Sequence, residues 1–233
     1  MTDIKDWYEE AYKNKGIKAQ RRYPNEELLR FLGVNFFDES VKDRSDIKVL
    51  EVGCGSCANL WMIARENFDT YGLDLSEEAL LLGKKMLDHW QVEANLKQGN
   101  FLELPYEDNS FDVVVDVFSM NCVNHDNFLK AIKEVFRVLK KGGVFFSYTP
   151  SQNSDAFINY KPAKKIDGFT LNGIHRESSP FVGNHFPFHF WETVSYRNAL
   201  INAGFSVKYL ETVRRSYHQE EDNFEHIVVY AWK

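Results

Sequence analysis

The residues of this 233-residue chain best suited to ligand chemistry lie in VLEVGCGSCAN, from Val49 to Asn59. A short apolar run ends at Gly53, and Gly53 and Gly55 allow the backbone to approach a ligand closely. The helix expected after them would present free backbone N–H groups at the same place. Asp74 ends the next predicted strand, 19 residues after Gly55. A carboxylate there can accept hydrogen bonds from both hydroxyls of a ribose, so we expect a site for a nucleoside-containing cofactor.

Two classes of cofactor satisfy this pattern. The spacing Gly53-x-Gly55-x-x-Ala58 also fits the G-x-G-x-x-G/A sequence of dinucleotide-binding folds. An NAD(P)-dependent oxidoreductase is therefore an alternative, and the rest of the chain has to decide between the two classes.

Strand and helix patterns alternate from residue 47 to residue 149. Short apolar runs predict strands over 47–52, 70–75, 96–101, 111–118 and 144–149, with helical spacing between them. This alternation is typical of a doubly wound, mostly parallel α/β sheet. Beyond it we expect a helix over 192–203 and strands over 205–212 and 224–232. The short connection 213–223 favours a hairpin, in which one strand must be antiparallel.

These patterns divide the chain into four segments. We expect an N-terminal helical cap over 1–46, a cofactor-binding core over 47–150, a substrate-binding insertion over 151–190, and a C-terminal helix and hairpin over 191–233. Ligands of open α/β sheets bind beyond the carboxyl ends of the strands, and the insertion leaves the fifth strand at that end. We therefore expect the insertion and residues 1–25 to form a lid over the site.

The sequence resembles the class I S-adenosylmethionine-dependent methyltransferases. The matching pieces, in family order, are VLEVGCG, YGLDLS, GNFLELPYEDNSFDVVV, the helix before LKKGGVFF, and WETVSYRNALINAGF. The resemblance implies a Rossmann-like sheet of seven strands with an antiparallel last strand. It also implies S-adenosylmethionine as cofactor and S-adenosylhomocysteine as product. A non-catalytic cofactor-binding protein is a further alternative, because Cys57 and Asn100 depart from the family pattern.

The resemblance assigns several residues to the methionine end of the cofactor. Gly53 and Gly55 would pack under this part, and Glu51 would orient its amino group. Val117, at the end of the fourth strand, would lie by the methionine backbone. N-terminal helices of the family often close over the cofactor, and Tyr23 is the aromatic residue we expect to cover the sulfonium.

The resemblance assigns a second group of residues to the adenosine end. Asp74 would hold the ribose, and Leu75 would lie against the adenine. Asn100 and Phe101 match the pair that contacts the adenine amine and the ring edge. The family's third glycine is Cys57 here, and its usual aspartate is Asn100, whose amide oxygen can still accept from the adenine amine.

Four histidines are candidates for a general base. An alcohol acceptor needs a base with a pKa near the working pH, whereas a neutral amine needs none. His175, His185 and His189 lie in the insertion, and His125 follows the fourth strand. We expect the catalytic residue among His175, His189 and His125.

Charge and composition limit the acceptor. The net charge is −6, and residues 151–190 carry too little positive charge to attract a nucleic acid. The aromatic residues of this insertion instead favour a closed pocket for a small molecule or a sugar ring, methylated on O or N. Trp7, Tyr12 and RRYPNEELLRFL faintly resemble methyltransferases of bacterial surface-glycan pathways.

Metal chemistry is not expected. Cys54 and Cys57 form a C-x-x-C pair, but a structural zinc site needs about four ligands and there is no second pair. A redox pair and small residues in a glycine-rich turn are the other interpretations. A metal-assisted transfer needs clustered carboxylates, and Asp116 has no matching acid in SQNSD after the fifth strand.

No signal peptide or membrane-spanning run is visible, so we expect a cytoplasmic protein with no membrane partner. The sequence does not indicate an oligomeric state.

Overall fold

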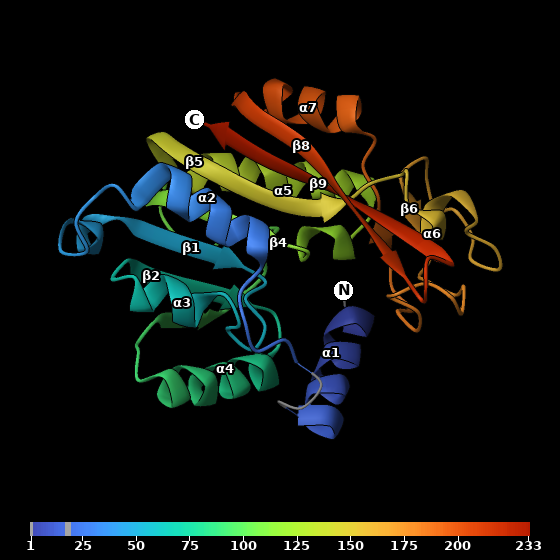
Figure 1. Cartoon of the computed structure of the whole chain (residues 1–233), viewed down its shortest axis with the longest axis horizontal. Helices are drawn as coiled ribbons and strands as arrows, with labels where there is room; N and C mark the ends of the chain where they lie inside the picture. Colours follow the sequence, from blue (N-terminus) through green and yellow to red (C-terminus); the bar gives the residue numbers. More distant parts are fainter. Residues whose placement is uncertain (1, 17–19) are drawn as a thin grey trace.

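The computed structural model describes residues 2–16 and 20–233, and Figure 1 shows a central sheet with helices on both faces. Its seven strands lie in the order β3-β2-β1-β4-β5-β9-β8. β9 runs antiparallel to both β5 and β8, whereas β1 to β5 pair in parallel. The predicted doubly wound fold with an antiparallel last strand is therefore confirmed.

The strands of this sheet are β1 (Lys48–Val52), β2 (Asp69–Asp74), β3 (Asn95–Gln98), β4 (Phe111–Val117), β5 (Leu139–Pro150), β8 (Ser206–Tyr217) and β9 (Asp222–Trp232). The longer helices are α1 (Thr2–Lys15), α2 (Glu26–Phe36), α4 (Glu77–Trp90), α5 (His125–Val138) and α7 (Thr193–Asn202). Shorter helical segments are α3 (Leu60–Arg65), α6 (Asp155–Ile158), η2 (Asp43–Asp46) and η3 (Met120–Cys122). No helix among the described residues is long and apolar enough to cross a bilayer.

Alternating side chains of the central strands build two cores. Val113 and Val115 of β4 pack in the cluster that holds α2, α3 and α4, while Val114 packs with α5 and α7. All three valines are fully buried, which explains why β4 is almost continuously apolar in sequence. The helices packed on both faces stabilise the sheet, whose carboxyl edge carries the turns described next.

One end of the sheet collects the turns that carry chemistry. β1 pairs with β2 on one side and with β4 on the other, so the carboxyl ends of the three strands lie together. The backbone N–H groups of Gly53 and Cys54 both donate to the carbonyl of Leu73, which ties the first turn to the end of β2. A ligand site is expected at this edge.

α1 crosses this edge of the sheet and contacts two parts of the chain. The carboxylate of Glu9 accepts hydrogen bonds from the backbone N–H groups of Glu77 and Glu78, at the start of α4. Toward its other side, the rings of Trp7 and Tyr8 pack against Phe186 of the insertion. α1 thus bridges α4 and the insertion, in the region expected for a lid (Figure 1).

The insertion folds around a small core of its own. α6 and the two short strands β6 (Thr170–Leu171) and β7 (Phe188–His189) surround a cluster of aromatic side chains. Most of these rings pack against each other and against Phe224 of β9. An ion pair of 3.2 Å between Arg176 and the buried carboxylate of Asp222 ties the insertion to the hairpin.

The connection expected over 213–223 is mostly strand. β8 continues to Tyr217 and β9 begins at Asp222, so the hairpin extends well beyond the rest of the sheet. Arg214, Arg215 and Ser216 are exposed. Because residues 214–216 bury no face, their sequence lacks the alternation of apolar and polar residues that predicts a strand.

Candidate cofactor pocket

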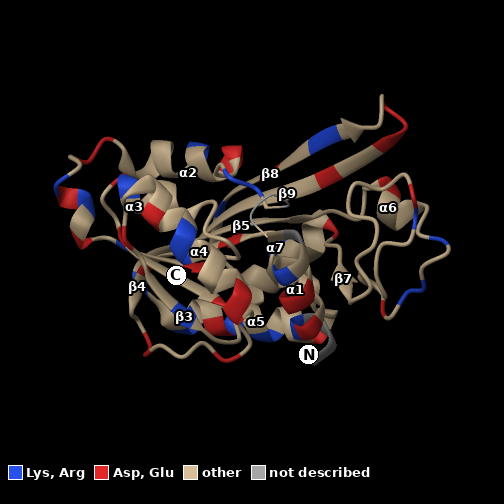
Figure 2. Cartoon of the chain, turned by 90° about the horizontal axis from the view of Figure 1, so that it is seen from below, with Lys and Arg blue, Asp and Glu red and all other residues tan. Residues whose placement is uncertain are grey.

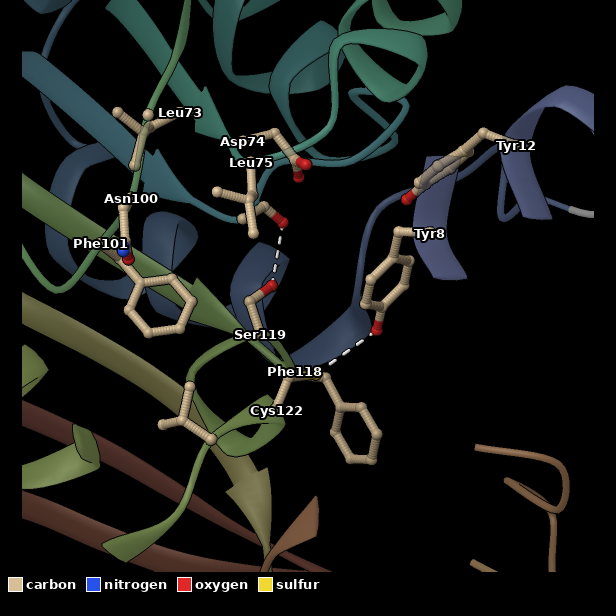
Figure 3. A pocket seen from close by; sticks show the side chains of 13 residues that line it. Tyr8, Tyr12, Leu73, Asp74, Leu75, Asn100, Phe101, Phe118, Ser119 and Cys122 are labelled. Carbon is tan, nitrogen blue, oxygen red and sulfur yellow. Dashed lines mark hydrogen bonds between the residues drawn. The ribbon is translucent and has the colours of Figure 1, made fainter. Parts of the chain in front are cut away.

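A pocket opens at the carboxyl edge of the sheet, where the turns after β1, β2 and β4 meet α1. Figure 3 shows Tyr8 and Tyr12 of α1 on one side, Asn100 and Phe101 on the other, and Asp74 and Ser119 between them. Its lining residues are Tyr8, Tyr12, Gly53, Leu73, Asp74, Leu75, Gly99, Asn100, Phe101, Phe118, Ser119, Cys122 and Val123. Among these described residues, Asp74 is the only one with an ionisable carboxylate or ammonium-type group.

The turn after β1 requires glycine for its backbone conformation and for its packing. Gly53 has φ +66° and Gly55 has φ +51°, in the left-handed region that favours glycine. A Cβ atom on Gly53 would lie 2.4 Å from the side chain of Ser119, whose hydroxyl donates to the Gly53 carbonyl. Cys57, where the family has its third glycine, also has a positive φ of 64°. The substitution therefore preserves the backbone turn.

Asp74 holds this turn against the end of β2. Its Oδ2 accepts from the backbone N–H of Gly55 at 2.8 Å, and its Oδ1 accepts from the N–H of Ser76 at 2.9 Å. Burial raises the pKa of the Asp74 carboxyl above its ordinary value, and these hydrogen bonds oppose the rise. The carboxylate lines the pocket, as expected of a ribose acceptor.

The predicted adenine end also lines the pocket. Leu75, Asn100 and Phe101 all face it, as Figure 3 shows. Asn100 Oδ1 accepts from the backbone N–H of Leu102 at 2.9 Å, which fixes the side chain at the pocket edge. The pocket thus brings together five of the predicted cofactor residues, from three separate turns.

Glu51 lies behind the glycine turn. It is 2% exposed, and its Oε1 accepts from the side-chain amide of Asn59. Its Oε2 has no hydrogen-bond partner among the described residues. Burial raises the pKa of Glu51 from 4.5 to about 8, although Asn59 and the nearby Arg21 charge oppose the rise. An ammonium group would satisfy this buried oxygen, so the site fits a cofactor that carries an amino group at this end.

Four predicted cofactor residues are not in the lining of the pocket: Glu51, Gly55, Val117 and Tyr23. Val117 is buried in the core that includes α2 and α3, one residue before Phe118, which does line it. Tyr23 is 64% exposed and packs edge-on against Trp61 and Trp90, on the side of α4. The predicted cover role of Tyr23 is therefore corrected, because its ring lies in a different cavity.

The three predicted catalytic histidines also lie outside the lining of the pocket. His189 is fully buried, and its Nε2 is 3.1 Å from Nδ1 of His125. Burial, together with the nearby His125, lowers the pKa of His189 to about 3, so its ring is neutral. His175 packs near His185 in the insertion. The geometry favours structural roles for these rings, in place of the expected role as base.

Several pocket residues were not predicted from the sequence. Tyr8 and Tyr12 come from one face of α1, and the Tyr8 hydroxyl lies 3.4 Å from Cys122 Sγ. Their spacing of four residues was the available signal, because residues four apart share a helix face. Phe118, with φ 63°, and Cys122 follow β4, where irregular backbone left no periodic pattern.

Asp116 and the C-x-x-C pair have structural partners. Asp116 Oδ1 accepts from the backbone N–H groups of Ser119 and Met120, which shapes the turn after β4. Cys54 and Cys57 are buried free thiols in the glycine turn. This arrangement favours the interpretation of small residues packed in a turn.

Comparison with known proteins agrees with this geometry. A family model described as a methyltransferase domain matches residues 49–143, which contain the glycine turn, Asp74, Asn100 and β4. Together with the seven-stranded sheet order, this match supports the predicted family, the class I S-adenosylmethionine-dependent methyltransferases. S-adenosylmethionine is the cofactor that this family implies.

Proteins similar to this chain include curated proteins and solved structures. A demethylmenaquinone methyltransferase of Bacillus mycoides is 38% identical over 111 residues, which cover 45% of this chain and 45% of that protein. The chain thus matches somewhat less than half the length of this relative. An uncharacterized protein of Methanocaldococcus jannaschii is 28% identical over 73% of this chain and 76% of its own length.

The fold of the chain also matches solved structures. A SAM-dependent methyltransferase of Methanosarcina mazei superposes with a TM-score of 0.65 at 22% identity, covering 80% of this chain and 92% of that one. At this identity, the likeness supports the fold.

Proposed function

We propose that the protein transfers the methyl group of S-adenosylmethionine to a small, uncharged acceptor. The observation that carries the proposal is the convergence of Gly53, Asp74, Leu75, Asn100 and Phe101 on one pocket. When bound, the cofactor supplies a methyl group on a sulfonium cation. The protein's task is to align the acceptor with that methyl group and to exclude water.

The chain has a group for each part of the cofactor. Asp74 accepts the ribose hydroxyls, while Asn100 and Phe101 hold the adenine edge. Glu51 accepts the amino group through its unpaired Oε2. Arg21, whose side chain donates to Asn59 Oδ1 at 2.8 Å, brings a positive charge beside Glu51 and is suited to the cofactor carboxylate.

α1 provides the cover. Tyr8 and Tyr12 stack with ring centroids 6.0 Å apart, and both rings line the pocket. Aromatic faces suit a desolvated cation, each worth about 0.5–2 kcal/mol. These two rings take the role first expected of Tyr23.

The remaining lining indicates an apolar acceptor. Phe118, Cys122 and Val123 lie at the end of β4, and no Lys, Arg or His is among the described residues that line the pocket. A phosphorylated or carboxylated acceptor would find no cation there. A quinone-type ring, as the name of the Bacillus mycoides relative mentions, fits this lining better than the sugar ring expected from the sequence.

The absence of a histidine from the described lining also bears on the acceptor atom. An acceptor whose nucleophilic atom is an electron-rich ring carbon, a phenolate or a neutral amine needs little help from a base. Such acceptors are compatible with the pocket, whereas a simple alcohol is not.

Methyl transfer from labelled S-adenosylmethionine to a panel of acceptors tests the proposal. The panel should hold reduced quinones, phenols, aromatic amines, sugars and phosphorylated metabolites. We expect turnover with uncharged ring compounds. Saturable cofactor binding without turnover on any of them would favour the non-catalytic alternative, and turnover confined to sugars or phosphates would overturn the acceptor class.

A further inference from the structure

A second cavity lies beside the second half of α4, and none of its lining residues lines the cofactor pocket. It has a volume of about 340 Å³, within the range of small-molecule sites. Its lining residues are Arg22, Tyr23, Lys85, Met86, His89 and Trp90. They come from the segment leading into α2 and from the second half of α4, and Figure 2 shows basic residues on both of these parts.

Two aromatic residues, Tyr23 and Trp90, line this cavity, and Trp61 packs behind Trp90. Trp61 of α3 and Trp90 stack face to face, with centroids 4.0 Å apart and an interplanar angle of 9°. Tyr23 meets both rings edge-on at 6.3 and 6.1 Å. Trp61 Nε1 donates to the carbonyl of Arg22 at 3.0 Å, so the segment is held against the ring pair. Tyr23 nevertheless remains 64% exposed, with its ring at the cavity.

The polar groups of the cavity are mainly hydrogen-bond donors. Arg22 and Lys85 are cations, and His89 can donate from a ring nitrogen. None of the three forms an ion pair with a described side chain, and no carboxylate is among the described lining residues. The indole N–H of Trp90 is buried without a partner in the part of the chain that the structure describes. In a protein of net charge −6, this is a local excess of unneutralised positive charge.

We propose that this cavity binds a small organic anion that carries a flat ring. The ring lies against Tyr23 and Trp90, and the anionic group lies between Arg22, Lys85 and His89. An aromatic carboxylate and a pyrimidine nucleotide share this chemistry. The ligand must be small, because the volume of the cavity is only about 340 Å³.

The cavity shares its segment with the cofactor pocket. Arg22 and Tyr23 line it, while the adjacent Arg21 bonds Asn59, the partner of Glu51. A ligand here therefore restrains the segment that positions Arg21.

Calorimetric titration tests the proposal. The probes are 2-naphthoate and uridine 5′-monophosphate, with 2-naphthamide as the uncharged ring and inorganic phosphate as the ringless anion. The protein is first saturated with S-adenosylhomocysteine, so that the cofactor pocket is blocked. We expect saturable one-to-one binding of at least one of the ring anions and at least ten-fold weaker binding of the amide and of phosphate. The anion that binds more tightly shows whether the natural ligand is an aromatic carboxylate or a pyrimidine nucleotide.

Matched variants on the surface of α4 locate the binding. Lys85→Glu should weaken binding of the ring anion about ten-fold, while Lys84→Glu, the exposed neighbour outside the cavity, should change it less than about two-fold. Tyr23→Ala should weaken binding, and Tyr23→Phe should restore it. Equal effects of the two lysine variants, or binding that disappears when S-adenosylhomocysteine is present, would overturn the site. If an oligonucleotide binds and the free anions do not, the proposal that the cavity binds a small anion is wrong.

Discussion

The carboxylate of Asp74 both holds the glycine turn and lines the pocket. Its carboxylate accepts from the Gly55 and Ser76 backbone N–H groups, and it lines the pocket where a ribose is expected. Each oxygen has a second lone pair that can accept a ribose hydroxyl. Losing the carboxylate therefore removes a ligand contact and loosens the glycine turn at the same time.

Asp74→Ala should raise the dissociation constant for S-adenosylhomocysteine about ten-fold or more, equivalent to roughly 1.5–3 kcal/mol. Calorimetry measures the affinity, and circular dichroism verifies the fold. Asp74→Asn is the control, because it keeps the shape and one acceptor oxygen and should lose less. A folded Asp74→Ala protein with wild-type affinity would mean that the acid serves the turn alone.

We expect Glu51 to make cofactor binding depend on pH. With a pKa raised to about 8, its carboxyl is protonated near pH 7 in the unliganded protein. An ammonium placed beside it favours the carboxylate, so the pKa falls on binding and a proton is released. Linkage then requires the affinity to increase as pH rises from about 6 toward 8.

Wild-type protein should release up to one proton on binding S-adenosylhomocysteine at pH 7. Titrations in buffers of different ionisation enthalpy measure this number. Glu51→Gln, which keeps the hydrogen-bonding shape, should abolish both the release and the increase with pH. Proton release that persists in Glu51→Gln would assign the titration to another group.

At the scale of elements, α1 is the part of the expected lid that reaches the pocket. Tyr8 and Tyr12 line it, while Glu9 anchors the helix to the start of α4. The insertion contributes no described residue to the lining, because its aromatic rings form the cluster around Phe186 and Phe188. It acts on the site through the packing of Trp7 and Tyr8 on Phe186.

Tyr8→Ala should weaken S-adenosylhomocysteine binding about five-fold or more, and Tyr23→Ala should leave it unchanged. Tyr8→Phe keeps the ring, loses only the contact with Cys122 Sγ, and should bind within about two-fold of wild type. Hydrogen exchange should show residues 2–15 more protected with the ligand bound. If Tyr23→Ala weakens binding and Tyr8→Ala does not, Tyr23 covers the cofactor, as the sequence predicted, and Tyr8 does not.

Elements with a regular period were predictable, and those held by tertiary contacts were not. β4 and the helix after it have clear apolar patterns, because each buries a face against the sheet. The extension of β8 through Arg214–Ser216 is exposed and has no such pattern. The small core of the insertion depends on Phe224, which lies more than thirty residues beyond β7 in the chain.

The same distinction holds for the site across the whole molecule. Asp74, Leu75, Asn100 and Phe101 were predictable because they follow strand ends that must meet at one edge of the sheet. Tyr8 and Cys122 were not, because their meeting depends on where α1 docks, 114 residues away in sequence. The three candidate histidines lie outside the lining of this pocket, because the chemical suitability of a ring does not say whether it faces a pocket or a core.

The central claim is that the pocket holds S-adenosylmethionine and not a nicotinamide cofactor. Its most direct test is calorimetric titration of the wild-type protein with S-adenosylhomocysteine and, separately, with NADH. We predict one-to-one binding of S-adenosylhomocysteine, weakened by Asp74→Ala, and no saturable binding of NADH at the same concentrations. Saturable NADH binding without S-adenosylhomocysteine binding would contradict the account.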